Sequence, residues 1–321
     1  MPAPAPHEVL VRISSVGVCG SDVHYYEHGR IGSYVVSDPL VLGHEASGVV
    51  EGVGAAVTRL SVGDRVSLEP GVPDLSCPQC LAGRYNLCEN MRFHATPPHD
   101  GSFAEYVVHH ELFAHRVPEQ ISDDAAALLE PLSVALWACQ KGGVTAGSRV
   151  LVTGVGPVGL LVVQVARALG AAEVTASDVN AQRLALAQAM GATDAVDPTS
   201  GVPSGHSRPD VLIDCSGNPG AIRAAIELVS PAGRVVLVGM GGAEYPMPMS
   251  TVQERELVVT GTFRYAHTWP TAIALVVSGA IRLDELVTSH HGIEQVPDAL
   301  SAARRDPTSI KPIVHPGVAT A

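Results

Sequence analysis

The sequence lacks three features that would each assign it to a class of protein. No run of lysine or arginine stands out in a chain of net charge −12, so neither nucleic acid nor an anionic membrane is an expected partner. The most apolar runs, 160–165 and 272–281, are far shorter than the roughly 20 residues that cross a bilayer. No charged segment followed by an apolar one opens the chain, which favours a cytoplasmic protein.

The six cysteines also lack the arrangement of a disulfide framework. Three of them cluster, one stands alone, and two lie in apolar segments where core packing is the simplest role: Cys77, Cys80 and Cys88; Cys19; Cys139 and Cys215. In a reducing compartment, clustered cysteines are more typical of a metal site than of disulfides. The 321 residues are enough for two domains, and no internal repeat is visible.

What the sequence does contain is a dinucleotide-binding pattern. A short apolar run, 150–152, is typical of a buried parallel strand and is followed by G-x-G-x-x-G at Gly154, Gly156 and Gly159 and then by a helical pattern to 169. These glycines allow a tight turn, close approach of a pyrophosphate and close helix–strand packing. A second strand, 173–177, ends at Asp178, whose carboxylate would bind the ribose hydroxyls. The alternative is a glycine-rich turn in an ordinary βαβ unit.

Asp178 also bears on the choice of cofactor. A carboxylate within about 4 Å of a 2′-phosphate would repel it by roughly 4 kcal/mol at an effective dielectric near 20. Arg183 could soften this repulsion or lie along the adenosine ribose instead. The sequence therefore predicts NAD rather than NADP.

Strand and helix patterns alternate beyond this motif, which predicts a doubly wound α/β (Rossmann) domain with a parallel sheet. Two helices are expected at 181–190 and 221–229, and none in the proline-rich segment 198–209. The expected strands are 150–152, 173–177, one near Ala195, 211–215, 235–238 and 257–263.

The first part of the chain predicts a small antiparallel β domain instead. Strands are expected at 9–16, 48–54, 64–69 and 101–108. A helix at 122–129 should end at Glu130 and Pro131, and a second helix, 133–140, leads into the dinucleotide motif. A helix at 296–305 and a strand at 313–314 are expected to fold back onto this domain.

Two groups of residues have the chemistry of metal ligands. Cys19 lies between glycines, and His44 and Glu45 interrupt an apolar stretch; together they are ligand types that Zn²⁺ accepts, with a position left for water or substrate. A buried cysteine and a core histidine paired with an acid would be the simpler account. The second group, Asp74, Cys77, Cys80 and Cys88, follows D-x₂-C-x₂-C-x₇-C in a segment without a helix signal. It predicts a structural zinc, with three free thiols as the alternative.

With these motifs, the chain resembles the zinc-dependent medium-chain dehydrogenases, in the sorbitol/xylitol (polyol) dehydrogenase branch. The matching phrases are GVCGSDVHY around Cys19, LGHEA around His44, GRYNLC ending at Cys88, ATPPHDG, EPLS starting at Glu130, and FRYAHTWP around Arg264. The family fold is a GroES-like mainly-β domain, split in sequence, around a Rossmann domain. The resemblance implies a GroES-like domain at 1–131 and 270–321 and an NAD-binding domain at 132–269.

The resemblance also implies roles for individual residues. Cys19, His44 and Glu45 would hold a catalytic zinc, with Asp22 orienting His44 and Glu130 approaching the metal directly or through water. Ser21 would take the substrate proton and pass it through the ribose to His24, or water near Glu130 would do so. The remaining matches line the polyol site, at Tyr25, Phe93, Arg264 and Tyr265, or contact the cofactor, at Val158, Asp178, Arg183, Val238, Gly239, Met240, Thr262, Phe263 and Arg264.

The implied reaction is reversible oxidation of a secondary hydroxyl of a polyol to a ketose, with NAD⁺ accepting the hydride. The alternatives are another zinc dehydrogenase, acting on threonine, glucose or a simple alcohol, and an inactive cofactor-binding relative. Relatives pair their Rossmann domains edge to edge, which implies a homodimer or homotetramer through 257–263. The residues leave open which polyol is the substrate.

The chain departs from the family pattern in two places. Relatives usually have some two dozen residues before the segment that begins here at His7. Their absence is expected to remove a β-hairpin and to leave the strand around Val9 as an exposed edge. The second departure is Asp74, which stands where the family's four-cysteine lobe has its first cysteine, so the lobe's zinc is in doubt.

Overall fold

The computed structural model describes residues 1–200, 207–242 and 244–317. These residues fold as two compact units. The first, called the β unit here, comprises 1–130, 269–277 and 282–321; the second, the α/β unit, comprises 131–268 and 278–281. Each unit is described by itself.

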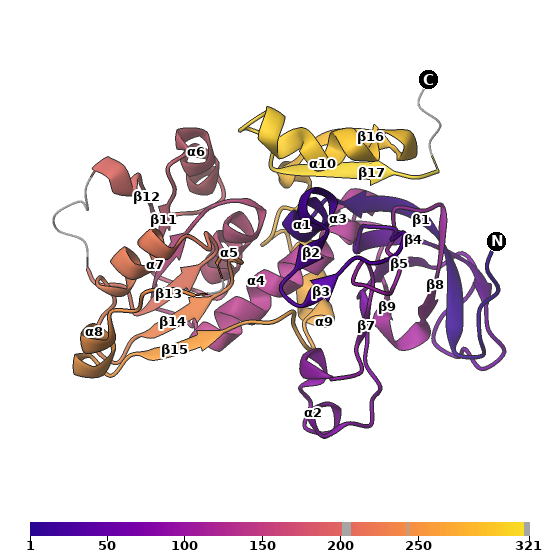
Figure 1. The fold of residues 1–321 in the computed structure, drawn as a ribbon, viewed down its shortest axis with the longest axis horizontal. Coiled ribbons are helices and arrows are strands. Elements are labelled where there is room, and N and C mark those ends of the chain that lie inside the picture. The colour runs from indigo at the N-terminus through magenta and orange to yellow at the C-terminus, as the bar shows by residue number, and fades with distance from the viewer. Residues whose placement is uncertain (201–206, 243, 318–321) are drawn as a thin grey trace. The chain divides into compact units, whose positions relative to one another are not determined.

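The β unit is built around a sheet that joins the two ends of the chain. Its strand order is β16-β17-β1-β4-β5-β9, with β8 also paired to β1, so the last strand, β17, lies beside the first (Figure 1). The strands of this sheet are β1 (Glu8–Gly17), β4 (Glu45–Val53), β5 (Arg65–Leu68), β8 (Tyr106–His110), β9 (Ala114–Arg116), β16 (Val287–Gly292) and β17 (Lys311–His315). The expected return of the tail onto the N-terminal part is confirmed.

Strand β1 is not the exposed edge that the sequence predicted. β4 pairs along one side of it, while β8 covers Glu8 to Arg12 and β17 covers Val16 and Gly17. Val9 and Val11 are fully buried, in a core shared with Val50, Val66 and other apolar side chains of the sheet. The prediction was wrong because three segments distant in sequence supply partners for this strand.

Helices of the β unit differ from expectation in two places. The segment 20–28, which carries no apolar stripe, forms α1 (Gly20–His28), and the lobe around the clustered cysteines contains α2 (Pro78–Leu81). The prediction of no helix in the lobe was wrong. Pro78 occupies the first helical position, and the Cys77 sulfur caps the helix by accepting a hydrogen bond from the Cys80 amide. The other elements are β2 (Arg30–Ile31), β3 (Tyr34–Val35), β6 (Gly71–Val72), β7 (Arg92–Phe93), α3 (Asp123–Ala127), α9 (Trp269–Val277), α10 (Val296–Arg305) and the 3₁₀ turns Tyr85–Leu87, Glu111–Phe113, Asp284–Leu286 and Ile293–Gln295.

The α/β unit confirms the doubly wound parallel sheet. Its strand order is β12-β11-β10-β13-β14-β15, all parallel, so the order reverses at β10. The strands are β10 (Arg149–Thr153), β11 (Glu173–Ser177), β12 (Asp194–Val196), β13 (Val211–Asp214), β14 (Arg234–Leu237) and β15 (Val258–Gly261). The helices are α4 (Leu129–Gly142), α5 (Pro157–Ala168), α6 (Ala181–Ala189), α7 (Pro219–Ile226) and α8 (Met249–Glu254).

Three boundaries in and around this unit differ from the predictions. Helix α4 begins at Leu129 and runs through Pro131, because a proline is tolerated in the first turn of a helix. Strand β8 starts at Tyr106 rather than at 101, and β15 ends at Gly261 rather than at 263. In the segment 198–209, Pro198–Ser200 forms a 3₁₀ turn, and 201–206 lie outside the described residues.

Candidate active site

Three buried or half-buried side chains of the β unit converge at one point. Cys19 caps the N-terminus of α1, while His44 and Glu45 stand at the start of β4. Their sulfur, imidazole nitrogen and carboxylate oxygen lie within 4.8 Å of one another. Gly17 makes room for this arrangement, because a Cβ there would lie 2.1 Å from Glu45 Oε2. The three donors have the types and the spacing that suit Zn²⁺.

A second carboxylate, Asp22, holds the ligand-bearing segments together. Its Oδ2 accepts a hydrogen bond from the Cys19 amide at 3.0 Å, and its Oδ1 accepts one from the Gly43 amide at 2.9 Å. The same Oδ1 lies 3.5 Å from His44 Nδ1. Burial alone would lower the pKa of His44, but Asp22 and Cys19 outweigh it and raise that pKa well above its ordinary value. The charges around His44 therefore favour a positive charge on or beside its imidazole.

Lys311, which the sequence analysis missed, lies in the same centre. Its Nζ contacts both carboxylate oxygens of Glu45, at 2.7 and 2.8 Å, and donates to the Val18 carbonyl at 2.9 Å. Burial would lower the pKa of Lys311, but Glu45, Cys19 and Glu130 together raise it. One signal was available: Lys311 is one of two lysines in the chain and stands directly before the apolar run of β17.

The other residues expected around this centre come from three elements. The Phe93 ring lies 5.7 Å from that of His44, and Phe93 and Tyr25 are both buried. Ser21 and His24 lie on α1 with Tyr25, although the His24 ring is exposed and next to that of His28. Glu130 is buried in the first turn of α4. The contact between Phe93 and His44 places a predicted substrate residue against a predicted ligand.

The lobe carries a second convergent group, nearer the surface. Its donors, on Asp74, Cys77, Cys80 and Cys88, also lie within 4.8 Å of one another. The Asp74 carboxylate already accepts hydrogen bonds from the Ser76 and Cys77 amides and from Asn90, which hold its pKa below the usual range. Partial burial and the neighbouring Cys77 and Cys88 sulfurs raise the pKa of Cys80 to about 12. Asp74 therefore both shapes the loop and completes a four-donor group.

The glycine motif of the α/β unit adopts the expected turn. Gly154 has φ +78°, and a Cβ on it would lie 2.6 Å from the Ser216 backbone. A Cβ on Gly159 would lie 2.0 Å from the Gly154 carbonyl, so only glycine permits this packing of α5 on the sheet. Gly156 is the N-cap of α5, and a Cβ on it would lie 3.9 Å from Arg183 Nη1, an ordinary van der Waals contact. The N-terminus of α5, with Val158 in its first turn, has the backbone amides and the positive dipole end that favour binding of a phosphate.

The other predicted cofactor residues lie at the carboxyl ends of the parallel strands. Asp178 follows β11, and its Oδ2 accepts a hydrogen bond from the Val155 amide in the glycine turn. Arg183 Nε is buried and has no hydrogen-bond partner among the described residues. The remaining positions follow β14 and β15: Val238, Gly239, Met240, Thr262, Phe263 and Arg264. This edge fits a dinucleotide.

The residues expected to bind the polyol in this unit lie just beyond β15. Arg264 has φ +55°, unusual for a residue with a side chain, and its guanidinium lies 4.6 Å from the centre of the Phe263 ring. Tyr265, by contrast, is buried. The backbone turn therefore separates two neighbouring side chains, one stacked near the surface and one in the core.

Comparison with known proteins places both units in one family. The alcohol dehydrogenase GroES-like domain matches residues 5–119, and the zinc-binding dehydrogenase domain matches 157–278. Sorbitol dehydrogenase of Gallus gallus is 43% identical over 314 residues, 95% of this chain and 88% of that protein. A probable D-xylulose reductase A of Neosartorya fischeri is 44% identical over 309 residues, 92% of this chain and 86% of that protein.

Two solved structures that contain a bound cofactor are also similar to this chain. A zinc-binding dehydrogenase of Sinorhizobium meliloti bound to NADP has a TM-score of 0.90 and 33% identity, with 98% of this chain and 94% of that chain covered. The rspB dehydrogenase of Escherichia coli with NADH has a TM-score of 0.90 and 31% identity, with the same coverage. The chain belongs to the zinc-dependent medium-chain alcohol dehydrogenases, which confirms the predicted family and fold class. Among the described residues, no helix is long and apolar enough to span a membrane.

Proposed function

We propose that the protein oxidises a secondary hydroxyl of a polyol of the sorbitol or xylitol type to a ketose, reversibly and with NAD⁺. The observation that carries this proposal is the buried convergence of Cys19, His44 and Glu45. The similarity to sorbitol dehydrogenase and to a D-xylulose reductase supports the substrate class. Bound zinc would lower the pKa of the substrate hydroxyl, and bound NAD⁺ would accept the hydride from its carbon.

The chain's own residues would prepare this chemistry in the β unit. Cys19, His44 and Glu45 hold the metal, and Asp22 fixes the orientation of His44. Glu130, a buried carboxylate, would approach the metal directly or through water. Ser21 accepts the hydroxyl proton and passes it towards His24, which is exposed and can release it to solvent.

Substrate selection is proposed for side chains of each unit taken by itself. In the β unit, Phe93, packed against His44, and Tyr25 would supply a dry wall. In the α/β unit, Arg264 and Tyr265 are the residues that the family resemblance assigns to the remaining hydroxyls. Buried polar groups left without partners would penalise an alcohol that lacks these hydroxyls. This favours polyols over simple alcohols as substrates.

NAD is proposed over NADP on the strength of Asp178. Its carboxylate follows β11 at the edge where the adenosine ribose would bind, and it would repel a 2′-phosphate by roughly 4 kcal/mol at 4 Å and a dielectric near 20. Replacing Asp178 by Ser should lower the preference for NAD over NADP, measured as the ratio of kcat/KM values, by at least about tenfold. An unchanged ratio would contradict this role for Asp178.

A second, weaker zinc also belongs to this proposal. The lobe at Asp74, Cys77, Cys80 and Cys88 would hold it.

The last feature of the proposal is the assembly of the protein. β15, an edge strand of the α/β sheet, carries an exposed Val258 and would pair two copies as a dimer or part of a tetramer. Light scattering after gel filtration, on wild type and Val258→Asp, would test the pairing.

The first experiment is NADH formation by the purified chain with sorbitol and with xylitol, before and after treatment with a zinc chelator. Activity that falls with the chelator and returns with added zinc is expected. A folded, zinc-loaded protein that is inactive on a polyol panel would contradict the proposal. Threonine, glucose and simple alcohols in the same panel distinguish another dehydrogenase from an inactive relative.

A further inference from the structure

A third convergent group lies in the β unit, outside both centres described above. Asp124 stands in α3, His290 in β16 and His315 at the end of β17. His290 Nε2 lies 2.7 Å from Asp124 Oδ2, and His315 Nε2 lies 2.8 Å from Asp124 Oδ1. The two imidazole rings stack with their centres 5.0 Å apart, so both aim a nitrogen at one carboxylate.

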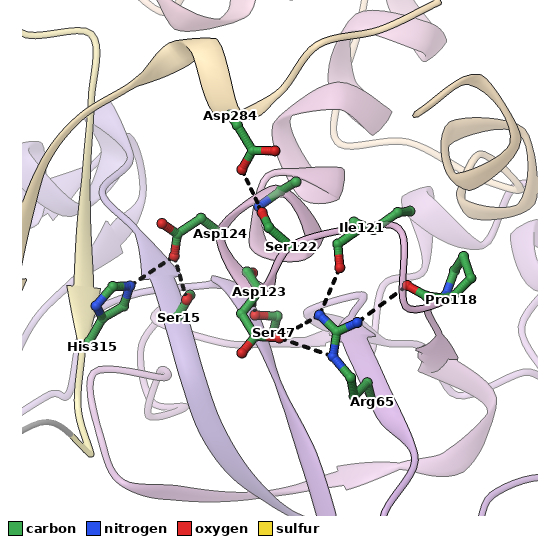
Figure 2. A network of polar contacts seen from close by, with 11 residues as sticks. Ser15, Ser47, Arg65, Pro118, Ile121, Ser122, Asp123, Asp124, Asp284 and His315 are labelled. Carbon is green, nitrogen blue, oxygen red and sulfur yellow. Dashed lines mark hydrogen bonds and ion pairs between the residues drawn. The ribbon is translucent and has the colours of Figure 1, made fainter. Parts of the chain in front are cut away.

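The carboxylate is fixed by a third contact. The Ser15 hydroxyl, from β1, donates to Asp124 Oδ1 at 2.6 Å, and Figure 2 shows this bond beside that from His315. The helix that carries Asp124 is also anchored, because the Ser122 hydroxyl accepts a hydrogen bond from the Ala125 amide and the Asp124 carbonyl accepts one from the Leu128 amide. The side chain is therefore preorganised rather than free to rotate into solvent.

The surroundings of Asp124 are acidic. A surface cavity of about 440 Å³ adjoins it, and its lining includes Asp123, Asp284 and His315. Arg65 and Asp123 neutralise each other, and Arg12 pairs with Glu51, which leaves the negative charge of Asp284 beside Asp124. A cation bound here would meet net negative charge and have an open side facing the cavity.

We propose that Asp124, His290 and His315 form a binding site for a divalent transition-metal ion, with Zn²⁺ as the probe. Two imidazoles and one carboxylate are a donor set that Zn²⁺, Ni²⁺ and Cu²⁺ accept, and the fourth position faces the cavity. The donor atoms lie within 4.8 Å of one another. Metal bonds of about 2.1 Å would require each imidazole to move away from the carboxylate by roughly 0.5 Å. His290, whose side chain is 54% exposed, has the freedom to do so.

Such an ion would join segments that are distant in sequence. Asp124 belongs to the first part of the chain, whereas His290 and His315 belong to the strands that return to it after the α/β unit. The metal would therefore fasten the two parts of the split unit. This role goes beyond the proposed function and does not depend on catalysis.

The test is a metal count by mass spectrometry after equilibrium dialysis of the full chain against micromolar Zn²⁺. Wild type is expected to bind one equivalent more than the double variant His290→Asn/His315→Asn. Asp124→Asn, which preserves the side-chain volume, should lose the same equivalent. Bound Cu²⁺ should give an electron paramagnetic resonance signal with two nitrogen couplings in wild type only.

The chain offers a matched control for losing two histidines. His7 and His110 also stack, with ring centres 6.1 Å apart, and His7 lies 3.6 Å from the Glu111 carboxylate. Their donors are not among the convergent groups of the described residues. His7→Asn/His110→Asn should therefore bind as much metal as wild type. Equal counts in wild type and the His290/His315 variant would overturn the proposal, as would a count that Asp124→Asn leaves unchanged.

Discussion

The two donor groups that the sequence indicated as zinc sites, both in the β unit, lie in opposite environments. His44 and Glu45 are buried beside the charges of Asp22 and Lys311, whereas Asp74 and Cys77 stand in a surface lobe and are held by their own backbone. In the first centre, opposed charges are desolvated, so the loss of any one leaves another uncompensated. In the lobe, water can replace each partner. Burial therefore decides which group is indispensable, more than ligand chemistry does.

The largest expected difference between the two centres is in turnover. His44→Asn should lower kcat/KM for sorbitol by about 10³-fold, because it removes a ligand at the reacting centre. Cys80→Ser, in the lobe, should change the same quantity by less than about threefold. Both are measured as NADH formation with zinc present. A Cys80→Ser enzyme as impaired as His44→Asn would show that the lobe serves catalysis, against the comparison drawn here.

A second expected difference is in stability and concerns Lys311. Lys311→Met leaves Glu45 buried without its cation and should lower the free energy of unfolding by about 3–5 kcal/mol in the chelator-treated protein. Lys311→Arg, which keeps the charge, should lose much less. Chemical denaturation of the three proteins measures this.

The same Lys311 variants also test whether Glu45 is a zinc ligand. If Glu45 is a zinc ligand, added zinc compensates its charge, and Lys311→Met should regain most of the lost stability. A deficit that zinc does not reduce would mean that Glu45 serves Lys311 alone. This outcome would remove Glu45 from the ligand set without affecting Cys19 or His44.

Two histidines of the β unit outside the donor groups, His94 and His109, and the surface lobe should also differ in how their contribution to stability responds to acid. Burial, with the charges of His44 and His99, lowers the pKa of His94 to about 4, and burial also lowers that of His109. Both therefore contribute stability that is complete above the unfolded pKa near 6.5 and is lost as the pH falls towards 4. The loss for His94 should be about 1–3 kcal/mol, and His94→Asn, which can still bond to Ser102, should flatten the profile between pH 6.5 and 4.

The lobe gives the opposite expectation. The pKa of Asp74 is held low by Asn90 and by two backbone amides, so its hydrogen bonds should survive acidification to pH 4.

The matched control for the His94 prediction is the replacement of an exposed histidine, His28→Asn. This variant should have the same dependence of stability on pH as wild type. A His94→Asn profile as steep as that of wild type would contradict the assignment.

Much of this architecture was predictable from the sequence, because local patterns determine it. The glycine motif, Asp178 and six short apolar strands were enough to predict a doubly wound parallel sheet, although not the order of its strands. The family phrases likewise pointed to Cys19, His44 and Glu45 before the structure placed their donors together. In each case, the informative residues are close together in the chain.

What escaped prediction depends on contacts between distant segments. Lys311 meets Glu45 across 266 positions, and His315 meets Asp124 across 191. The strand around Val9 was expected to be an edge because the family's N-terminal hairpin is missing, whereas β8 and β17 pair with it in the structure. The return of the tail was predicted, but periodicity and spacing do not report these individual pairings, since they arise only when the split unit closes.

The smallest expected effect concerns Asp74 itself and tests how far the lobe can be converted into a stronger metal site. Asp74→Cys adds a thiolate, a softer donor that zinc prefers, and should raise the zinc affinity of the lobe on the order of 10-fold. Part of the gain is offset, because Asp74 also accepts hydrogen bonds from the Ser76 and Cys77 amides that shape the loop. Zinc release to a chromogenic chelator measures the affinity, with Ser76→Cys as the control that adds a thiol outside the donor group. Equal release from both variants would mean that the Asp74 position does not contact the metal, and that its hydrogen bonds alone hold the lobe.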